Sequence, residues 1–408
     1  MPGTRHVVLI VLLAWMSATT CVASACPYCP RTDDLTLCEK LADSDAACVV
    51  KFLESRNGEE LSMQETTFLI VQVMKRADKF QVDGKIVTAF GVTANSGDTF
   101  LLMGKKDTEG EMEWSLPIEI DEISREYVRQ APSHEVMSEP QRLIYFLKFL
   151  DFANPVISND AFLEFAKASF EDVNALVRQL KASGKESGLR SKLRKWLDDE
   201  NQQLDVRRAF YGMLLGLCGT DDDASFLEEK LMAPIDPQRI RPWIGGMMAG
   251  YLMLRGEDGL RFLVEKKIEG LSVDESDNDL DSMRSTLVFL WDFRRNQFSE
   301  ESLRVAMRKF LDRPEFAETA IRDLARWKDW VPLGKLTQSY GRDPWETRSA
   351  KEKIVAYALI CLKDVPTSSG NRMPEHAIEA KKFLDQLDPA FVQAVKQSLF
   401  FVPKNPVK

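Results

Sequence analysis

Hydrophobic and polar residues follow two different periods along the chain. Between Ala46 and Ile120, short apolar segments rich in Val, Ile, Phe, Thr and Leu alternate with clusters of Gly, Asn and Asp. Such segments are typical of β-strands, and the clusters between them are typical of turns. The pattern predicts five strands, over residues 46–54, 65–76, 84–92, 98–104 and 112–118.

After Pro117 the period changes to that of amphipathic helices. Apolar residues recur at i, i+3, i+4 and i+7 as far as about Leu399, and capping residues and prolines mark the connections. The first predicted helical runs are 122–131, 140–153, 159–180 and 191–199. Five strands without an interleaved long helix fit a small closed barrel of OB type. We therefore predict an α+β protein in two domains, an OB-like five-stranded β-barrel at 26–120 and an all-α domain at 121–402.

One stretch of the helical part, "LDVRRAFYGMLLGLCGTDDDASFLEEKL" from Leu204 to Leu231, has a distinctive order. An Asp-x-Arg start is followed by a helix of small and apolar residues, an acidic turn and a second helix. This resembles a HEAT repeat, in which an Asp and an Arg bridge neighbouring repeats and Gly and Ala permit close helix packing. Basic residues recur in weaker echoes at roughly the 40-residue spacing of HEAT-type pairs. These basic positions are Arg207, Arg241, Arg284, Arg322 and Lys353.

The HEAT resemblance implies a helical solenoid over 121–402. In such a stack each helix pair buries its apolar stripe against its neighbours, and a long concave face stays free for a protein partner. A helical domain without repeats remains the alternative. Most tryptophans of this part are expected to fill space between layers. Two that lie beside prolines, Trp330 and Trp345, are the best candidates for binding aromatics.

Residues 1–25 have the pattern of an export signal. Arg5 precedes an apolar core at 7–16, and an Ala-Ser-Ala sequence ending at Ala25 is typical of a cleavage site. The sequence predicts a mature chain that starts at Cys26 and is secreted or periplasmic. The apolar core is shorter than the roughly 20 residues that span a bilayer, and no transmembrane segment is predicted later. Acylation of Cys26 is a less favoured alternative, because the lipobox has Ala in place of the usual Leu.

Four of the seven cysteines crowd together near the predicted mature N-terminus: Cys26, Cys29, Cys38 and Cys48. In an oxidising compartment they predict two disulfides, with all three pairings open. The other two cysteines of the mature chain, Cys218 and Cys361, lie in apolar helical runs and are expected to be buried thiols.

The Cys26-Pro-Tyr-Cys29 sequence is similar to the redox motif of glutaredoxins. That chemistry requires a strand before the motif and a helix N-terminus that lowers the pKa of the first thiol. No strand precedes Cys26 in the mature chain, so a structural disulfide is the favoured interpretation. Redox catalysis and a zinc site formed by the four cysteines are the alternatives, and the cysteine spacing lacks the paired C-x-x-C form of zinc sites.

The first cysteines, followed by "SDAACVVKFLESRNG" at 44–58, resemble the start of netrin-like modules, which include the tissue inhibitors of metalloproteinases. The resemblance implies an OB barrel over about 26–120. It also implies that the α-amino group and carbonyl of Cys26 would chelate the zinc of a protease. The chain departs from this family because it has C-x-x-C in place of C-x-C, and because no cysteine follows Cys48 in the barrel. Acylation of Cys26 would remove the chelating amine.

The charge balance bears on the class of partner. The chain has 54 Lys and Arg against 63 Asp and Glu, for a net charge of −9. Nucleic acids and anionic membranes require a clustered positive surface, so we predict neither as a partner. The most basic stretch, 181–195, runs directly into acidic residues 198–200 and is typical of a solvated loop and helix start.

The sequence contains little recognisable catalytic machinery. Only His134 and His376 follow the predicted signal, and there is no H-E-x-x-H, G-x-S-x-G or phosphate-loop motif. The acidic run 274–282 resembles a calcium loop but lacks its turn glycine. We therefore predict an exported, non-enzymatic binding or scaffold protein with no cofactor, which acts on a protein partner through a helical-repeat surface. The alternatives are an inhibitor of extracytoplasmic metalloproteases through the Cys26 terminus, and an unrecognised hydrolase that uses carboxylates.

Overall fold

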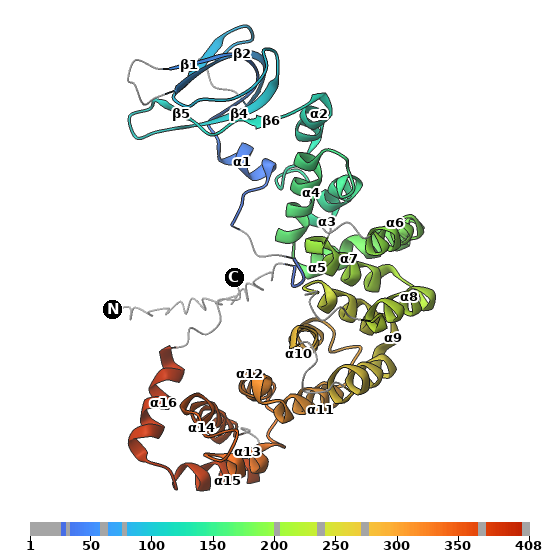
Figure 1. Cartoon of the computed structure of the whole chain (residues 1–408), viewed down its shortest axis with the longest axis vertical. Helices are drawn as coiled ribbons and strands as arrows, with labels where there is room; N and C mark the ends of the chain where they lie inside the picture. Colours follow the sequence, from blue (N-terminus) through green and yellow to red (C-terminus); the bar gives the residue numbers. More distant parts are fainter. Residues whose placement is uncertain are drawn as a thin grey trace, which may run out of the picture.

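The described part of the chain contains a short helix, an antiparallel sheet and then a helical region whose helices follow one another along an arc (Figure 1). The structure is a computed structural model. It describes residues 26–29, 33–57, 64–75, 80–199, 205–234, 241–270, 277–365 and 373–401. The predicted export signal, 1–25, lies outside the described residues.

The five predicted strands are present in the sheet. Its strands are β1 (Ala46–Asn57), β2 (Gln64–Lys75), β3 (Lys85–Thr88), β4 (Thr99–Lys106), β5 (Met112–Trp114) and β6 (Ile118–Glu119). The order is β3-β2-β1-β4-β5, and β6 also pairs with β4. The last predicted strand, 112–118, is divided into β5 and β6. Pro117 falls in this gap, and it has no amide hydrogen to donate to a ladder.

The sheet curves into a half-barrel with an aromatic interior. The rings of Phe52 and Phe68 are 6.3 Å apart, and those of Phe68 and Phe100 are 6.0 Å apart. No hydrogen-bonded pairing joins the edge strands β3 and β5 among the described residues. Phe80 and Trp114 make an edge contact at 5.1 Å and also pack on this interior. The described strands therefore form a half-barrel in place of the closed barrel that the sequence predicted.

A short helix, α1 (Leu37–Asp43), joins the sheet to the arc. It starts with a capping box, in which the Thr36 hydroxyl accepts from the Glu39 amide and the Glu39 carboxylate accepts from the Thr36 amide. The face of the sheet that contains Leu101 shares one hydrophobic core with α1 and the first helices of the arc. The predicted boundary after residue 120 lies next to the N-cap of α2.

Fifteen further helices make up the described part of the arc: α2 (Glu122–Gln130), α3 (Glu139–Phe146), α4 (Pro155–Lys167), α5 (Phe170–Ala182), α6 (Glu186–Asp198), α7 (Asp205–Cys218), α8 (Asp221–Met232), α9 (Ile244–Val264), α10 (Asp277–Phe293), α11 (Glu300–Arg308), α12 (Pro314–Arg326), α13 (Leu333–Ser339), α14 (Arg348–Lys363), α15 (Glu375–Leu384) and α16 (Pro389–Phe401). Short 3₁₀ or π turns lie at Leu147–Phe149, Glu265–Glu269 and Lys309–Asp312. Alternate helices contact each other. Thus α5 contacts α3 and α7, and α14 contacts α12 and α16.

Helices α7 and α9 pack unusually closely through glycines. A Cβ atom at Gly246 would lie 1.9 Å from the carbonyl oxygen of Ala209, and one at Gly250 would lie 2.1 Å from that of Gly212. Helix α9 is itself broken at Gly256, whose φ of 58° is in the left-handed region that favours glycine. The small residues of this part of the sequence therefore allow two backbones to touch.

Candidate functional site on the inner face of the helical arc

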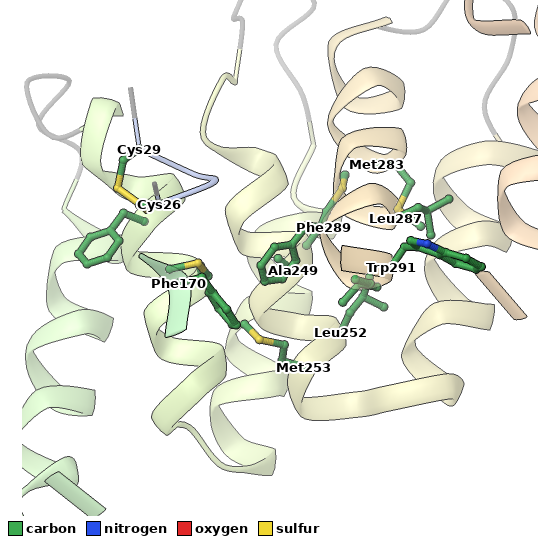
Figure 2. Close-up of a cluster of buried hydrophobic side chains, with 14 of the residues drawn as sticks. Cys26, Cys29, Phe170, Ala249, Leu252, Met253, Met283, Leu287, Phe289 and Trp291 are labelled. Carbon is green, nitrogen blue, oxygen red and sulfur yellow. A yellow bond between two sulfur atoms is a disulfide. The ribbon is translucent and has the colours of Figure 1, made fainter. Parts of the chain in front are cut away.

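The segment Cys26–Cys29 lies against helices that are distant from it in the sequence. It sits on the inner side of the arc beside α5 and α10 (Figure 1), and Figure 2 shows its two cysteines next to Phe170. Cys26 and Cys29 form a disulfide with their Cα atoms 5.4 Å apart, and the Cys29 amide donates to the Cys26 carbonyl at 3.3 Å. The segment is therefore a closed four-residue turn docked on the helical region.

Tyr28 anchors this turn. Its hydroxyl donates to Oγ1 of Thr286 at 3.3 Å, and its ring makes an edge contact with Phe289 at 5.1 Å. The Thr286 hydroxyl in turn donates to the carbonyls of Ser282 and Gly245, at 2.8 and 3.1 Å. Burial raises the pKa of the Tyr28 phenol above its usual range, so the phenol remains a neutral donor.

Aromatic rings from α5 and α10 line the place where the turn docks. Phe170 opens α5 directly after the capping residue Ser169, which fixes the start of that helix. The Phe170 ring lies 5.2 Å from Phe289 and 5.0 Å from Phe293. A Cβ atom added to Gly245 at the start of α9 would lie 3.5 Å from the Tyr28 ring. We call the surface formed by Gly245, Thr286, Phe289 and Phe170 the docking site.

The two cysteines of the turn are well buried in this site. Cys26 is 5% exposed and Cys29 is 9% exposed, and both belong to the hydrophobic core of the helical region. Disulfide sulfurs and the ring of a phenol present mostly apolar surface. Burial of this surface against the aromatic side chains of the docking site is therefore the main source of binding free energy. The arrangement holds a disulfide-closed turn against aromatic side chains.

The expectation of two disulfides needs a correction. Cys38 and Cys48 are free thiols, and only Cys26 and Cys29 are bonded among the described cysteines. Successive residues of a strand point to opposite faces. Cys48 on β1 points into the half-barrel, whereas Cys38 on α1 packs against the core on the other face of the sheet. The two thiols therefore lie on opposite faces and are not bonded to each other. Burial raises the pKa of Cys38 to about 12 and that of Cys48 to about 11, so both thiols are protonated and poorly reactive.

The structure also shows the state of the remaining cysteines and bears on the zinc site considered above. Cys218 and Cys361 are buried free thiols, as predicted, and burial raises the pKa of each to about 12. Within the ranges that the structure describes, no three His, Cys, Asp or Glu side chains are grouped so that they could hold a metal ion.

The two tryptophans predicted as binding aromatics lie elsewhere in the arc, and both are engaged in packing. Trp345 is 8% exposed. Trp330 is half-buried, donates its indole N–H to Asp364 at 2.8 Å and stacks on His376 with ring centroids 6.0 Å apart. Neither belongs to the docking site.

Two buried carboxylates, Asp160 and Glu164 on α4, test the hydrolase alternative. The oxygens of Asp160 accept hydrogen bonds from the Leu37 amide and from the Tyr127 hydroxyl, each at 2.7 Å. Glu164 pairs with Arg142 at 2.9 Å. Asp160 thus caps α1 against α4, and Glu164 neutralises a buried guanidinium. A cavity of about 560 Å³ borders Asp160, and its lining is mainly apolar. Both carboxylates thus hold neighbouring elements together in the described structure.

Burial raises the pKa of Asp160, which predicts a specific pH dependence. When the pKa of a carboxyl is higher in the folded state than in the unfolded state, the carboxyl contributes most to the free energy of unfolding at low pH. This contribution decreases as pH rises from the unfolded-state pKa of about 4 through the folded-state pKa. In Asp160→Asn this contribution is absent. We therefore expect the loss of unfolding free energy in the variant, relative to the parent chain, to be larger at about pH 4 than at pH 7. Urea titrations at both pH values measure it.

Asp121 provides a control of opposite sign. It caps α2 by accepting from the Ser124 amide at 2.7 Å, and this hydrogen bond lowers the pKa of its carboxyl. The stabilisation by such a group is lost as pH falls. The loss in Asp121→Asn should therefore be larger at pH 7 than at about pH 4. The same pH trend in both variants would contradict the assignment of a raised pKa to Asp160.

Sequence reasoning did not identify the residues that form the docking site. Tyr28 and Thr286 are 258 residues apart, and no local pattern links them. The one available signal was a tyrosine held between two closely spaced cysteines. Such a tyrosine is presented on a tight turn once the disulfide closes.

No helix among the described segments combines the length and the apolar character needed to cross a membrane. In comparisons with known proteins, the chain matches no family model, no curated protein and no solved structure.

Proposed function

We propose that the protein is an exported, non-enzymatic binding protein that holds a peptide segment of a protein partner on the inner face of a HEAT-like helical stack. The observation that carries this proposal is the docked turn itself. A four-residue segment, Cys26–Cys29, is held on the inner side of the arc by aromatic contacts and by the hydrogen bond from Tyr28 to Thr286. A surface that binds one short segment of its own chain has the shape and chemistry to bind a similar segment of another.

Contacts between successive parts of the arc support the HEAT-like stack. Arg241 pairs with Asp279 at 2.5 Å, and Arg284 pairs with Asp323 at 2.8 Å. Both pairs join positions separated by about one HEAT-type unit. The contacts between alternate helices are those expected when helix pairs stack on one another. The half-barrel, with its aromatic interior, is the proposed OB-like module at the start of the mature chain.

The alternative functions receive less support from the same geometry. A metalloprotease inhibitor would have to present the main chain of Cys26, which is buried here and whose carbonyl accepts from Cys29. A thioether lipid on Cys26 is incompatible with the disulfide to Cys29, because both use the same sulfur. The carboxylates that a hydrolase would use, Asp160 and Glu164, are engaged in capping and in an ion pair.

The test is capture of partners from the extracytoplasmic fraction of the source organism with two matched variants. Tyr28→Ala removes the anchor of the turn and vacates the docking site. Gly245→Leu fills the same site, because a side chain at Gly245 points toward the Tyr28 ring. We expect one partner to be enriched with Tyr28→Ala and lost with Gly245→Leu, with circular dichroism showing both variants folded. Equal capture by the two variants would overturn the proposal.

A further inference from the structure

We propose that the Cys26–Cys29 turn is a built-in competitor that blocks the docking site only while its disulfide is closed. When the chain's own turn has left, the site accepts the same kind of group from a partner: a tight, disulfide-closed turn that presents a phenol. This inference rests on the proposed function and adds the class of ligand and the means of control.

Tyr28 and the two cysteines hold the turn in different ways, and Cys26 and Cys29 contribute buried apolar surface. Tyr28 makes the hydrogen bond to Thr286 and the ring contact with Phe289. The backbone hydrogen bond from the Cys29 amide to the Cys26 carbonyl is internal to the turn. A ligand of only four residues has a small contact surface and binds weakly in free solution, and tethering to the same chain raises its effective concentration. An intramolecular competitor of this kind fills the site yet can be displaced.

The disulfide determines how well Tyr28 is presented. It holds the two Cα atoms 5.4 Å apart and closes the turn around Pro27 and Tyr28. Without it, the four residues regain backbone and side-chain freedom that docking must remove again. Opening the disulfide therefore weakens docking, although it changes none of the residues on the helices.

Opening proceeds by ordinary thiol–disulfide exchange with a dithiol reductant. One thiolate of the reductant attacks a sulfur of the turn and forms a mixed disulfide, and the other sulfur of the turn leaves as a thiolate and takes up a proton. The second thiol of the reductant then displaces the remaining cysteine. In total the turn gains two electrons and two protons, and the reductant becomes a disulfide. Because Cys26 and Cys29 are buried when docked, exchange takes place on the undocked turn.

The experiment measures binding of a synthetic Cys-Pro-Tyr-Cys peptide, closed by its disulfide, to the full chain by ligand-observed NMR titration. The proteins are the oxidised parent chain, Tyr28→Ala, and the double variant Cys26→Ser/Cys29→Ser. The last two should bind the peptide at least about tenfold more tightly than the parent chain, because their own turn no longer competes. Parent chain that has been reduced and alkylated provides a second open-turn form.

Matched controls separate this inference from the proposed function. On Tyr28→Ala, a closed Cys-Pro-Ala-Cys peptide and an open Ser-Pro-Tyr-Ser peptide should bind at least about tenfold more weakly than the closed tyrosine peptide. Gly245→Leu should bind none of the peptides. Equal affinity for the parent chain and both open-turn forms would overturn control by the disulfide. Failure of the closed peptide to bind Tyr28→Ala would overturn the ligand class, while the proposed function would still stand if capture depends on the docking site.

Discussion

Replacing Gly246 with alanine is expected to lower the free energy of unfolding by about 2 kcal/mol, although it adds a single methyl group. The new Cβ would lie 1.9 Å from the carbonyl oxygen of Ala209 on the neighbouring α7, and the other close atoms also belong to the Ala209 backbone. Backbone atoms cannot rotate away, so the two helices must separate. Helix propensity alone favours alanine by about 1 kcal/mol, and the overpacking cost of about 3 kcal/mol outweighs it.

Gly188 in α6 supplies the matched control. A Cβ atom there meets nothing within 4 Å, so Gly188→Ala has the gain in helix propensity without the clash. It should raise the free energy of unfolding by up to about 1 kcal/mol. Urea unfolding followed by far-ultraviolet circular dichroism measures both variants. A change of the same sign in the two would contradict the close packing of α7 on α9.

Local pattern was sufficient to predict most of the secondary structure. The five strands and the change of period after Pro117 are determined by residues close together in sequence. The predicted run 159–180 is divided in the structure between α4 and α5, because Ser169 caps α5 by accepting from the Asp172 amide at 3.0 Å. Serine three residues before an acidic residue is a recognised helix start, so the sequence contained that signal.

Features that depend on distant contacts could not be predicted in this way. Among the basic positions proposed from the repeat spacing, Arg241 and Arg284 form ion pairs and Arg207 donates to the Leu150 carbonyl at 2.8 Å. Arg322 and Lys353 are exposed instead. Spacing along the chain does not determine which side of a helix meets its neighbour.

The docking site is the clearest example of this limit. The Cys26–Cys29 disulfide is a local feature, and its cysteines were among those predicted to be bonded. The position of the closed turn against Thr286 depends on the curvature accumulated by all the helices between them (Figure 1). The sequence therefore predicted that these two cysteines are bonded, but it predicted neither their pairing with each other nor the surface that the turn binds.

Replacing Arg142 with leucine is expected to cost about 3–5 kcal/mol of unfolding free energy. Arg142 has no exposed surface, and its guanidinium pairs with Glu139 at 2.7 Å and with Glu164 at 2.9 Å. The substitution leaves Glu164, which is 3% exposed, without its buried counter-charge. Arg348→Leu is the surface control. Arg348 pairs with Glu352 while 82% of its side chain is exposed, so its loss should cost at most about 1 kcal/mol.

The pH dependence and a double variant identify the cause of the loss in Arg142→Leu. Burial already raises the pKa of Glu164, and removal of the guanidinium raises it further, so the unpaired carboxyl takes up a proton as pH falls. The cost of Arg142→Leu should therefore be smaller at about pH 5 than at pH 8. Adding Glu164→Gln should recover part of the loss at pH 8, because no buried charge remains. A cost that is independent of pH and unchanged in the double variant would mean that Arg142 acts through packing alone.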